Sequence, residues 1–345
     1  MSRRGDGALT RTKKIGRFFS SMAASRLGRR GPIHLSHLVT TRCDCRCPTC
    51  IWRDNRAEEL DTEEIEALYR EAGEAGFVAN ALWGGEPLLR GDLEDLCHAS
   101  RGAGMITTVI TNGYHLPERA EDLAPAIDSL IVSIDYPDAA RHDTFRGKAG
   151  IFDRALAGIR AVRGANPSPK VIVNCLLHRG NEGDMGAMAE LARSLGASLY
   201  VCPAHEGAMP ETGASNRDSL ARPEGLREAA RELLALKRTH RINNSRTYLR
   251  RFLLEGEAYN CSAPFVFLTV GAEGDVTNCL RKGNPYGNLR ESGLSEILER
   301  WDREEVVRGA RGCHSCINPN VVDTSYAWGL RPEPLLNALA LFFSR

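Results

Sequence analysis

The chain has 345 residues and is almost electrically neutral, with 45 lysines and arginines against 44 aspartates and glutamates. A protein without a basic surplus has no electrostatic basis for binding an acidic polymer, so no nucleic-acid partner is indicated. No apolar stretch approaches the roughly 20 residues that cross a bilayer. Eleven cysteines without a secretory signal predict a reducing, cytoplasmic setting in which thiols bind metal rather than form disulfides.

The N-terminal segment predicts a basic amphipathic helix. Between Lys13 and Arg30, apolar residues recur at helical spacing and are surrounded by lysines and arginines. Such a helix can lie on an anionic membrane, so a peripheral position on the inner membrane face is one expectation. The other is that this helix and the apolar tail Leu335–Phe343 pack on the protein's own surface.

From Ile33 onward, short apolar strands alternate with amphipathic helices, which favours parallel strands joined by crossover helices. A first helix begins near Asp61, which offers an N-cap with Glu63 and Glu64 in the first turn. The six predicted strands are Ile33–Val39, Phe77–Leu82, Met105–Ile110, Leu130–Ile134, Lys170–Leu176 and Ser198–Val201. Later helices are predicted near Arg90–Arg101, Glu118–Ala126, Ile151–Arg163 and Met185–Leu195.

The sequence changes character after the sixth strand. Pro203–Pro223 is rich in Gly, Pro, Ser and Asn and predicts a linker or mobile loop. Helices are expected over Pro223–Arg238, Arg246–Leu254 and Leu294–Val307, with a β-hairpin between Phe265 and Leu280. The expected units are a basic arm (1–32), an α/β core (33–222), a helical linker (223–258), a small α+β unit (259–325) and an apolar tail (326–345).

Four cysteines stand close together between Cys43 and Cys50, and Cys43, Cys47 and Cys50 follow a CxxxCxxC spacing. Thiolates this close repel one another unless a metal takes up their charge. A short loop with these offsets can hold three irons of a 4Fe–4S cluster, and one iron stays free because such a cluster normally takes four protein ligands. The competing interpretations are a zinc knuckle and a disulfide. Cys45 fits no ligand role and is interpreted as a bystander.

Three further motifs follow, each just beyond a predicted strand: Gly84-Gly85-Glu86-Pro87, Thr111-Asn112-Gly113 and Ser133-Ile134-Asp135. Together with the cysteine loop they resemble the radical S-adenosylmethionine (SAM) superfamily. The resemblance implies a partial (β/α)6 barrel, and the strand assignment independently puts the motifs at the C-terminal rim of such a barrel. It also implies that the free iron binds the amino and carboxylate groups of SAM. Reductive cleavage then gives a 5′-deoxyadenosyl radical, which abstracts a hydrogen atom from the substrate.

The SAM contacts are expected at this rim. In the family, the turn matched by Gly84–Pro87 hydrogen-bonds the amino group of SAM, and its glycines let the backbone approach a ligand. Short polar side chains after the next strands can hold the ribose or the carboxylate, although Asn and Asp also cap turns. Arg146 resembles a position that pairs with the carboxylate, or it forms a surface salt bridge. The full expected set is Gly84, Gly85, Glu86, Pro87, Asn112, Ser133, Asp135, Arg146 and Asn174.

The sequence departs from the family at Thr49. The residue before the last cysteine of the loop is often aromatic in relatives and packs on the adenine of SAM, whereas threonine offers no ring. Adenine packing must then come from elsewhere, for which Trp52 and the backbone of the fifth strand are the candidates.

A second cysteine set stands near the C-terminus. Four thiolates from a hairpin and a distant turn suffice for one fully ligated 4Fe–4S cluster. The arrangement resembles the twitch unit, the shortened form of the SPASM auxiliary-cluster domain, and a structural zinc site is the alternative. The expected ligands are Cys261, Cys279, Cys313 and Cys316.

The sequence thus predicts a radical SAM enzyme whose reaction is an oxidation or a radical cross-link on a peptide, a small molecule or a lipid. A flavodoxin- or ferredoxin-like reductant is its implied partner. Catalytic residues stay undefined; Cys202, His205 and Glu206 follow the sixth strand, where a hydrogen donor or base would act. A buried cysteine and a loop histidine are the plainer interpretation there. The alternative from another class is a non-catalytic zinc-binding module.

Overall fold

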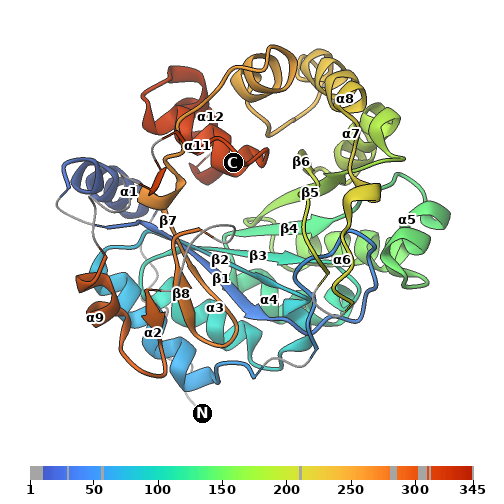
Figure 1. The fold of residues 1–345 in the computed structure, drawn as a ribbon. Helices are drawn as coiled ribbons and strands as arrows, with labels where there is room; N and C mark the ends of the chain where they lie inside the picture. The colour runs from blue at the N-terminus through green and yellow to red at the C-terminus, as the bar shows by residue number, and fades with distance from the viewer. Residues whose placement is uncertain are drawn as a thin grey trace.

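The computed structural model describes residues 11–28, 31–55, 58–209, 212–279, 286–301, 309–310 and 312–343. In these segments the strands form one sheet in the order β6-β5-β4-β3-β2-β1-β7-β8-β9 (Figure 1). All neighbouring pairs from β6 to β7 are parallel, and the last two pairs are antiparallel. The strands are β1 (His34–Thr40), β2 (Ala79–Gly84), β3 (Ile106–Thr111), β4 (Ser129–Ser133), β5 (Lys170–Leu177), β6 (Ser198–Pro203), β7 (Phe267–Val270), β8 (Asp275–Thr277) and β9 (Gly287–Asn288).

Helices connect the parallel strands and follow the outside of the curved sheet (Figure 1). Six parallel strands in chain order with crossover helices make the partial barrel that was predicted. The first crossover helix begins with a capping box between Asp61 and Glu64. The helix after β4 was not predicted. These helices are α2 (Thr62–Ala75), α3 (Leu93–Gly102), α4 (Leu116–Ala126), α5 (Ala139–Arg146), α6 (Ile151–Ala165), α7 (Met185–Ser194) and α8 (Pro223–Leu236).

The two faces of the barrel sheet differ in burial. Outward positions such as Leu82, Val109 and Val132 are fully buried beneath the helices. Alternate positions point the other way and stay half-buried, so the inward face is within reach of solvent or a ligand. The half-buried inward side chains are uncharged at neutral pH. This holds for β1–β4 and for the half of β5 that is nearest the rim. These side chains are His34, Ser36, Ala81, Trp83, Thr108, Ile110, Ile131, Ser133, Asn174 and Leu176.

Helix α1 (Arg11–Arg26) packs on the barrel. Phe18 is buried in a small apolar cluster against it, and Lys14 forms an ion pair with Asp128 at an Nζ–Oδ1 distance of 2.8 Å. Arg17 donates hydrogen bonds to backbone carbonyls around the C-terminal ends of α2 and α3. These basic residues, which had suggested a membrane surface, are thus engaged with the protein itself. Within the described segments, no helix is both long and apolar enough to pass through a membrane.

The C-terminal helices α11 (Pro319–Trp328) and α12 (Pro332–Phe343) lie at the open side of the sheet (Figure 1). Helix α11 bonds to β6 through a 2.6 Å hydrogen bond from the Tyr200 hydroxyl to Asn320 Oδ1. It also bonds to the segment before β7 through Ser325. This helix, which the sequence did not reveal, therefore links the two edges of the partial barrel.

Two further predictions need comment. The hairpin is confirmed by β7 and β8, and β7 extends the barrel sheet by pairing with β1. The helix predicted over Leu294–Val307 is shorter in the described residues, where α9 ends at Glu299; residues 302–308 lie outside them. The described parts of Pro203–Pro223 lie back against the barrel instead of leading away from it, since the Asn216 side chain donates to the Thr49 carbonyl at 3.1 Å.

Candidate active site

The cysteine loop starts where β1 ends, and the two glycines after β2 support its base. A Cβ at Gly84 would lie 2.1 Å from the Thr40 carbonyl oxygen, and one at Gly85 would lie 2.2 Å from that of Arg42. Backbone bonds join the same segments, including Gly85 N to Thr40 O at 2.7 Å. Glycine is therefore required because the backbone here comes close to the start of the cysteine loop. The sequence had suggested that it comes close to a ligand.

Glu86 connects the Gly84–Pro87 turn to the Thr111–Gly113 turn. Its side chain is fully buried and accepts hydrogen bonds from the Thr111 hydroxyl and from the backbone N–H of Asn112, both at 2.7 Å. It also caps the short turn that begins at Pro87 by accepting the N–H of Leu88. Burial raises the pKa of Glu86 to about 7. The carboxyl group is thus occupied in holding two strand ends together.

Asn112 connects these motifs to the cysteine loop. Its side-chain amide donates to Asp44 at 3.2 Å and to the Cys45 thiol at 3.3 Å. Asp44 also lies 3.1 Å from His115 Nε2 and 3.1 Å from Lys148 Nζ. The sequence analysis did not select Asp44, His115 and Lys148, because nothing in linear spacing shows that three distant polar residues meet beside a cysteine.

Asp135 and Arg146 form a buried ion pair next to the loop. The distance between Arg146 Nη2 and Asp135 Oδ2 is 2.6 Å, and the two side chains are 13% and 0% exposed. Arg146 Nη1 lies 3.8 Å from the Cys47 sulfur. Burial raises the pKa of Cys47 to about 11, although Arg146 works in the opposite direction. A buried thiol of this kind becomes a thiolate when a metal takes its charge.

Unsatisfied polar atoms gather around this ion pair. Three buried side-chain atoms around the pair make no hydrogen bond with the described residues, namely His142 Nε2, Arg146 Nε and His178 Nε2, while Asp135 Oδ2 has only its ion pair with Arg146. The pKa of His178 is lowered by burial, and the charges of Asp135 and Arg146 act on it as well. Buried polar atoms are normally paired, so an unsatisfied group of them around this ion pair fits a polar ligand such as SAM.

Ser133 and Asn174 lie next to each other on the inward face. They are register partners on β4 and β5, and both are half-buried. Ser133 is the last residue of β4 and stands two positions along the chain from Asp135, and the strand pairing brings Asn174 to the same level as Ser133. Trp52 packs edge-to-face on the inward-facing Trp83, with ring centroids 5.2 Å apart.

The four cysteines of the loop differ in exposure. Cys43, Cys47 and Cys50 are all half-buried, whereas Cys45 is 2% exposed. The ligand atoms of Cys43, Asp44 and Cys45 lie within 4.8 Å of one another. A hydrogen bond with Cys43, together with burial, raises the pKa of Cys45 well above its ordinary value. Cys45 is thus the most buried of the four cysteines in this loop.

The second cysteine set is assembled from three distant segments. Cys261 donates its backbone N–H to the Cys313 carbonyl at 3.1 Å. Burial, followed by the nearby thiols of Cys313, Cys316 and Cys279, raises the pKa of Cys261 to about 11. The Tyr259 hydroxyl accepts the Cys316 N–H at 3.2 Å and donates to the Cys316 carbonyl at 2.9 Å.

The three weak catalytic candidates separate in the structure. Cys202 lies on the inward face with Tyr200 and Ile172, and burial raises its pKa to about 12. Glu206 instead pairs with the exposed Arg217 at 2.8 Å on the surface. The backbone carbonyl of His205 accepts a hydrogen bond from Asn216, another residue that the sequence analysis did not select.

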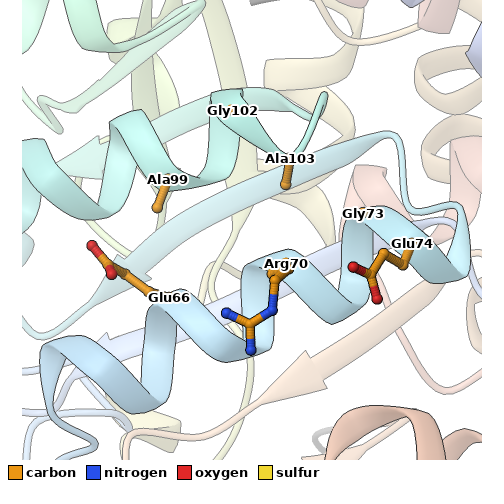
Figure 2. Close-up of a pocket in the computed structure, with 7 residues that line it drawn as sticks. All are labelled: Glu66, Arg70, Gly73, Glu74, Ala99, Gly102 and Ala103. Atoms are coloured by element: carbon orange, nitrogen blue, oxygen red, sulfur yellow. The ribbon is translucent and has the colours of Figure 1, made fainter. Parts of the chain in front are cut away.

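A hollow on the outer surface lies between α2 and α3 (Figure 2). Its lining includes Glu66, Arg70 and Glu74 of α2, and none of its lining residues is a cysteine. It is formed by the outer helices and belongs to the face opposite the inward side chains. The candidate site is therefore at the rim of the barrel rather than in this hollow.

Comparisons with known proteins agree with this geometry. Residues 38–192 match the family model of the radical SAM superfamily. A PqqA peptide cyclase of Methylocella silvestris is 34% identical over 310 residues, which cover 83% of this chain and 80% of the relative. An AdoMet-dependent heme synthase of Methanosarcina barkeri is 29% identical over 298 residues, covering 79% and 83% respectively.

Two solved structures share the fold. Streptococcus suis SuiB bound to S-adenosylmethionine has a TM-score of 0.64 at 17% identity, covering 83% of this chain and 71% of SuiB. The protein anSMEcpe with bound AdoMet has a TM-score of 0.61 at 14% identity, covering 91% and 98% respectively. The chain therefore belongs to the radical SAM superfamily and is a radical SAM enzyme, a family whose chemistry implies a 4Fe–4S cluster and SAM.

Proposed function

We propose that Cys43, Cys47 and Cys50 hold the 4Fe–4S cluster and leave its fourth iron to SAM. When bound, the cluster supplies the electron that cleaves SAM to a 5′-deoxyadenosyl radical, which abstracts a hydrogen atom from the substrate. The observation that carries this proposal is the group of unsatisfied buried polar atoms around the Asp135–Arg146 pair, whose guanidinium lies 3.8 Å from the Cys47 sulfur. A flavodoxin- or ferredoxin-like protein is the proposed electron donor.

The rim side chains have distinct proposed tasks. The Arg146 guanidinium is placed to receive the SAM carboxylate while it keeps its contact with Asp135. Ser133 and Asn174 offer hydroxyl and amide groups to the ribose. Glu86 acts indirectly: its carboxyl is bound to Thr111 and Asn112, so the amino group of SAM meets the backbone of the Gly84–Pro87 turn.

We also propose that Cys261, Cys279, Cys313 and Cys316 hold a second 4Fe–4S cluster in a twitch-like unit over residues 259–325. The support is that Cys261 donates its backbone N–H to the Cys313 carbonyl at 3.1 Å, although the two residues lie 52 positions apart along the chain. Zinc would suit four thiolates equally, so metal analysis of the second site decides between the two.

A peptide is the substrate class that we propose. Support comes from relatives named as PqqA peptide cyclases and from SuiB, whose structure is also known with its precursor peptide SuiA. The inward face is uncharged at its half-buried positions and carries Trp83, Ile110, Ile131 and Leu176, so we propose that the reacting side chain is uncharged. A charged group against this face would lose hydration without gaining a partner.

Anaerobic preparation tests the function. A brown protein with about eight irons that cleaves SAM when it is reduced supports both proposed clusters. About four irons with SAM cleavage, and zinc in place of the rest, would retain the first cluster and reject the second. A colourless protein that neither binds iron nor cleaves SAM would contradict the assignment of Cys43, Cys47 and Cys50.

A further inference from the structure

One buried side chain fastens the loop between β6 and α8 to the cysteine loop. Asn216 is 3% exposed, and its side-chain amide donates to the carbonyl oxygen of Thr49 at 3.1 Å and to that of His205 at 2.8 Å. Its side-chain oxygen accepts the backbone N–H of Gly207 at 2.9 Å. Asn216 thus ties two parts of its own loop to the residue immediately before Cys50.

A second observation places the same loop on the other side of Cys50. A Cβ at Gly207 would lie 2.9 Å from Cγ2 of Ile51, so only glycine allows this approach without displacement. Thr49 itself is 7% exposed. Figure 1 shows the two loops side by side, the one after β6 in yellow and the one after β1 in blue. The β6–α8 loop therefore covers both neighbours of this cysteine.

We propose that Asn216 is a positioning residue that makes the β6–α8 loop a wall of the SAM site. The inference rests on the proposed function, because it takes Cys50 as a cluster ligand. Thr49 has no ring to offer to the adenine, and the loop that Asn216 holds lies against it. This loop bounds the site at the place where an aromatic side chain would otherwise stand. Loss of the amide would remove the side-chain partner of the Thr49 and His205 carbonyls and of the Gly207 N–H.

The test compares Asn216→Ala with Asn166→Ala. Asn166 is a matched control because its side chain also bonds two backbone groups, Ala124 O at 3.2 Å and Ser168 N at 3.0 Å, far along the chain from the cysteine loop. Iron content, the SAM dissociation constant and amide hydrogen exchange are measured on anaerobically reconstituted protein. We expect Asn216→Ala to bind SAM about tenfold more weakly, because the three hydrogen bonds that hold the loop against Thr49 are lost. Gly207 should exchange faster, and Asn166→Ala should match the wild type in both measurements.

A second variant keeps the test decisive if the alanine variant loses iron. Asn216→Asp retains the acceptor for the Gly207 N–H but has no donor for the Thr49 carbonyl, so it should also weaken SAM binding. Wild-type SAM affinity in a fully loaded Asn216→Asp or Asn216→Ala protein would overturn the proposal. Failure of the wild-type protein to bind SAM would instead contradict the proposed function. That failure would be detected before any variant is compared with the wild type.

Discussion

The two cysteine sets are built in opposite ways. The first occupies one short loop, Cys43–Cys50, which the barrel rim holds through Gly85, Asn112 and Asn216. The second brings together Cys261, Cys279 and the Cys313–Cys316 turn, and its bonds join segments more than 50 positions apart. A loop site has its ligand spacing fixed by covalent geometry, whereas an assembled site depends on the packing of separate segments.

This difference has energetic consequences. Ordering the first set costs the entropy of one short loop, and the surrounding barrel supplies the compensating contacts. Ordering the second set requires segments more than 50 residues apart to be held together, so a metal there contributes to folding as well as to chemistry. Substitutions at the first site should therefore affect mainly SAM chemistry, and those at the second mainly local order.

The largest expected effect comes from removing one ligand of each set. Cys47→Ala should reduce SAM cleavage to background, because a cluster held by two thiolates is not retained. Cys316→Ala should keep SAM cleavage and lose about half of the iron. Iron analysis and SAM-cleavage assays measure both. If Cys316→Ala also abolished SAM cleavage, the two sites would not be independent.

The buried ion pair should show the next largest effect. Arg146→Ala leaves Asp135 buried without its cation, which typically destabilises a protein by about 3–5 kcal/mol. SAM binding should fall at the same time, since the proposed carboxylate partner is lost. Thermal unfolding and a SAM titration check this expectation. Arg141→Ala is the control on the same helix, because Arg141 is 47% exposed and its ion pairs lie at the surface. Equal SAM affinity in both variants would contradict the proposed role of Arg146.

A smaller effect is expected at the second site from Tyr259→Phe. This change leaves the Cys316 N–H and carbonyl without their hydroxyl partner, at a cost of about 1–3 kcal/mol. The second cluster should be retained less well, while SAM cleavage persists. Iron content and thermal unfolding are the measurements. Tyr326→Phe serves as the control, because its hydroxyl makes only a 3.4 Å contact with Glu257 O. If Tyr326→Phe lost as much iron, a specific role for Tyr259 would be rejected.

The smallest effect is expected from Lys148→Met at the first site. Lys148 lies 3.1 Å from Asp44, and its removal takes one positive charge from the surroundings of the cluster loop. The reduction potential of a cluster depends on nearby charge, so it should become more negative, with iron content unchanged. A redox titration followed by electron paramagnetic resonance measures the shift. Lys13→Met, on the exposed side of α1, should leave the potential in place. An unchanged potential in Lys148→Met would show that Asp44 screens this charge.

Local sequence was sufficient for much of the barrel and for the cysteine loop. Strand and helix periodicity located six parallel strands within about two residues at most ends, because outward positions must be apolar beneath the helices. The spacing of Cys43, Cys47 and Cys50 lies within one short loop, so the proposed cluster ligands could be named without knowledge of the fold. The capping pattern at Asp61 is likewise decided within four residues.

Long-range contacts decided the rest. The two glycines before Glu86 allow the end of β1 to come close, and the Glu86 carboxyl bonds to the end of β3. No spacing along the chain could reveal either contact. The meeting of Asp44 with Lys148, and of Asn216 with Thr49, joins residues more than 100 positions apart. Helix α11 begins with a local signal, the Asn318 N-cap followed by Pro319, but its position is set by contacts with β6 and with the segment before β7. Sequence determined what each segment can form, whereas packing determined which polar groups meet, because such pairs gain their free energy only when the chain brings them together.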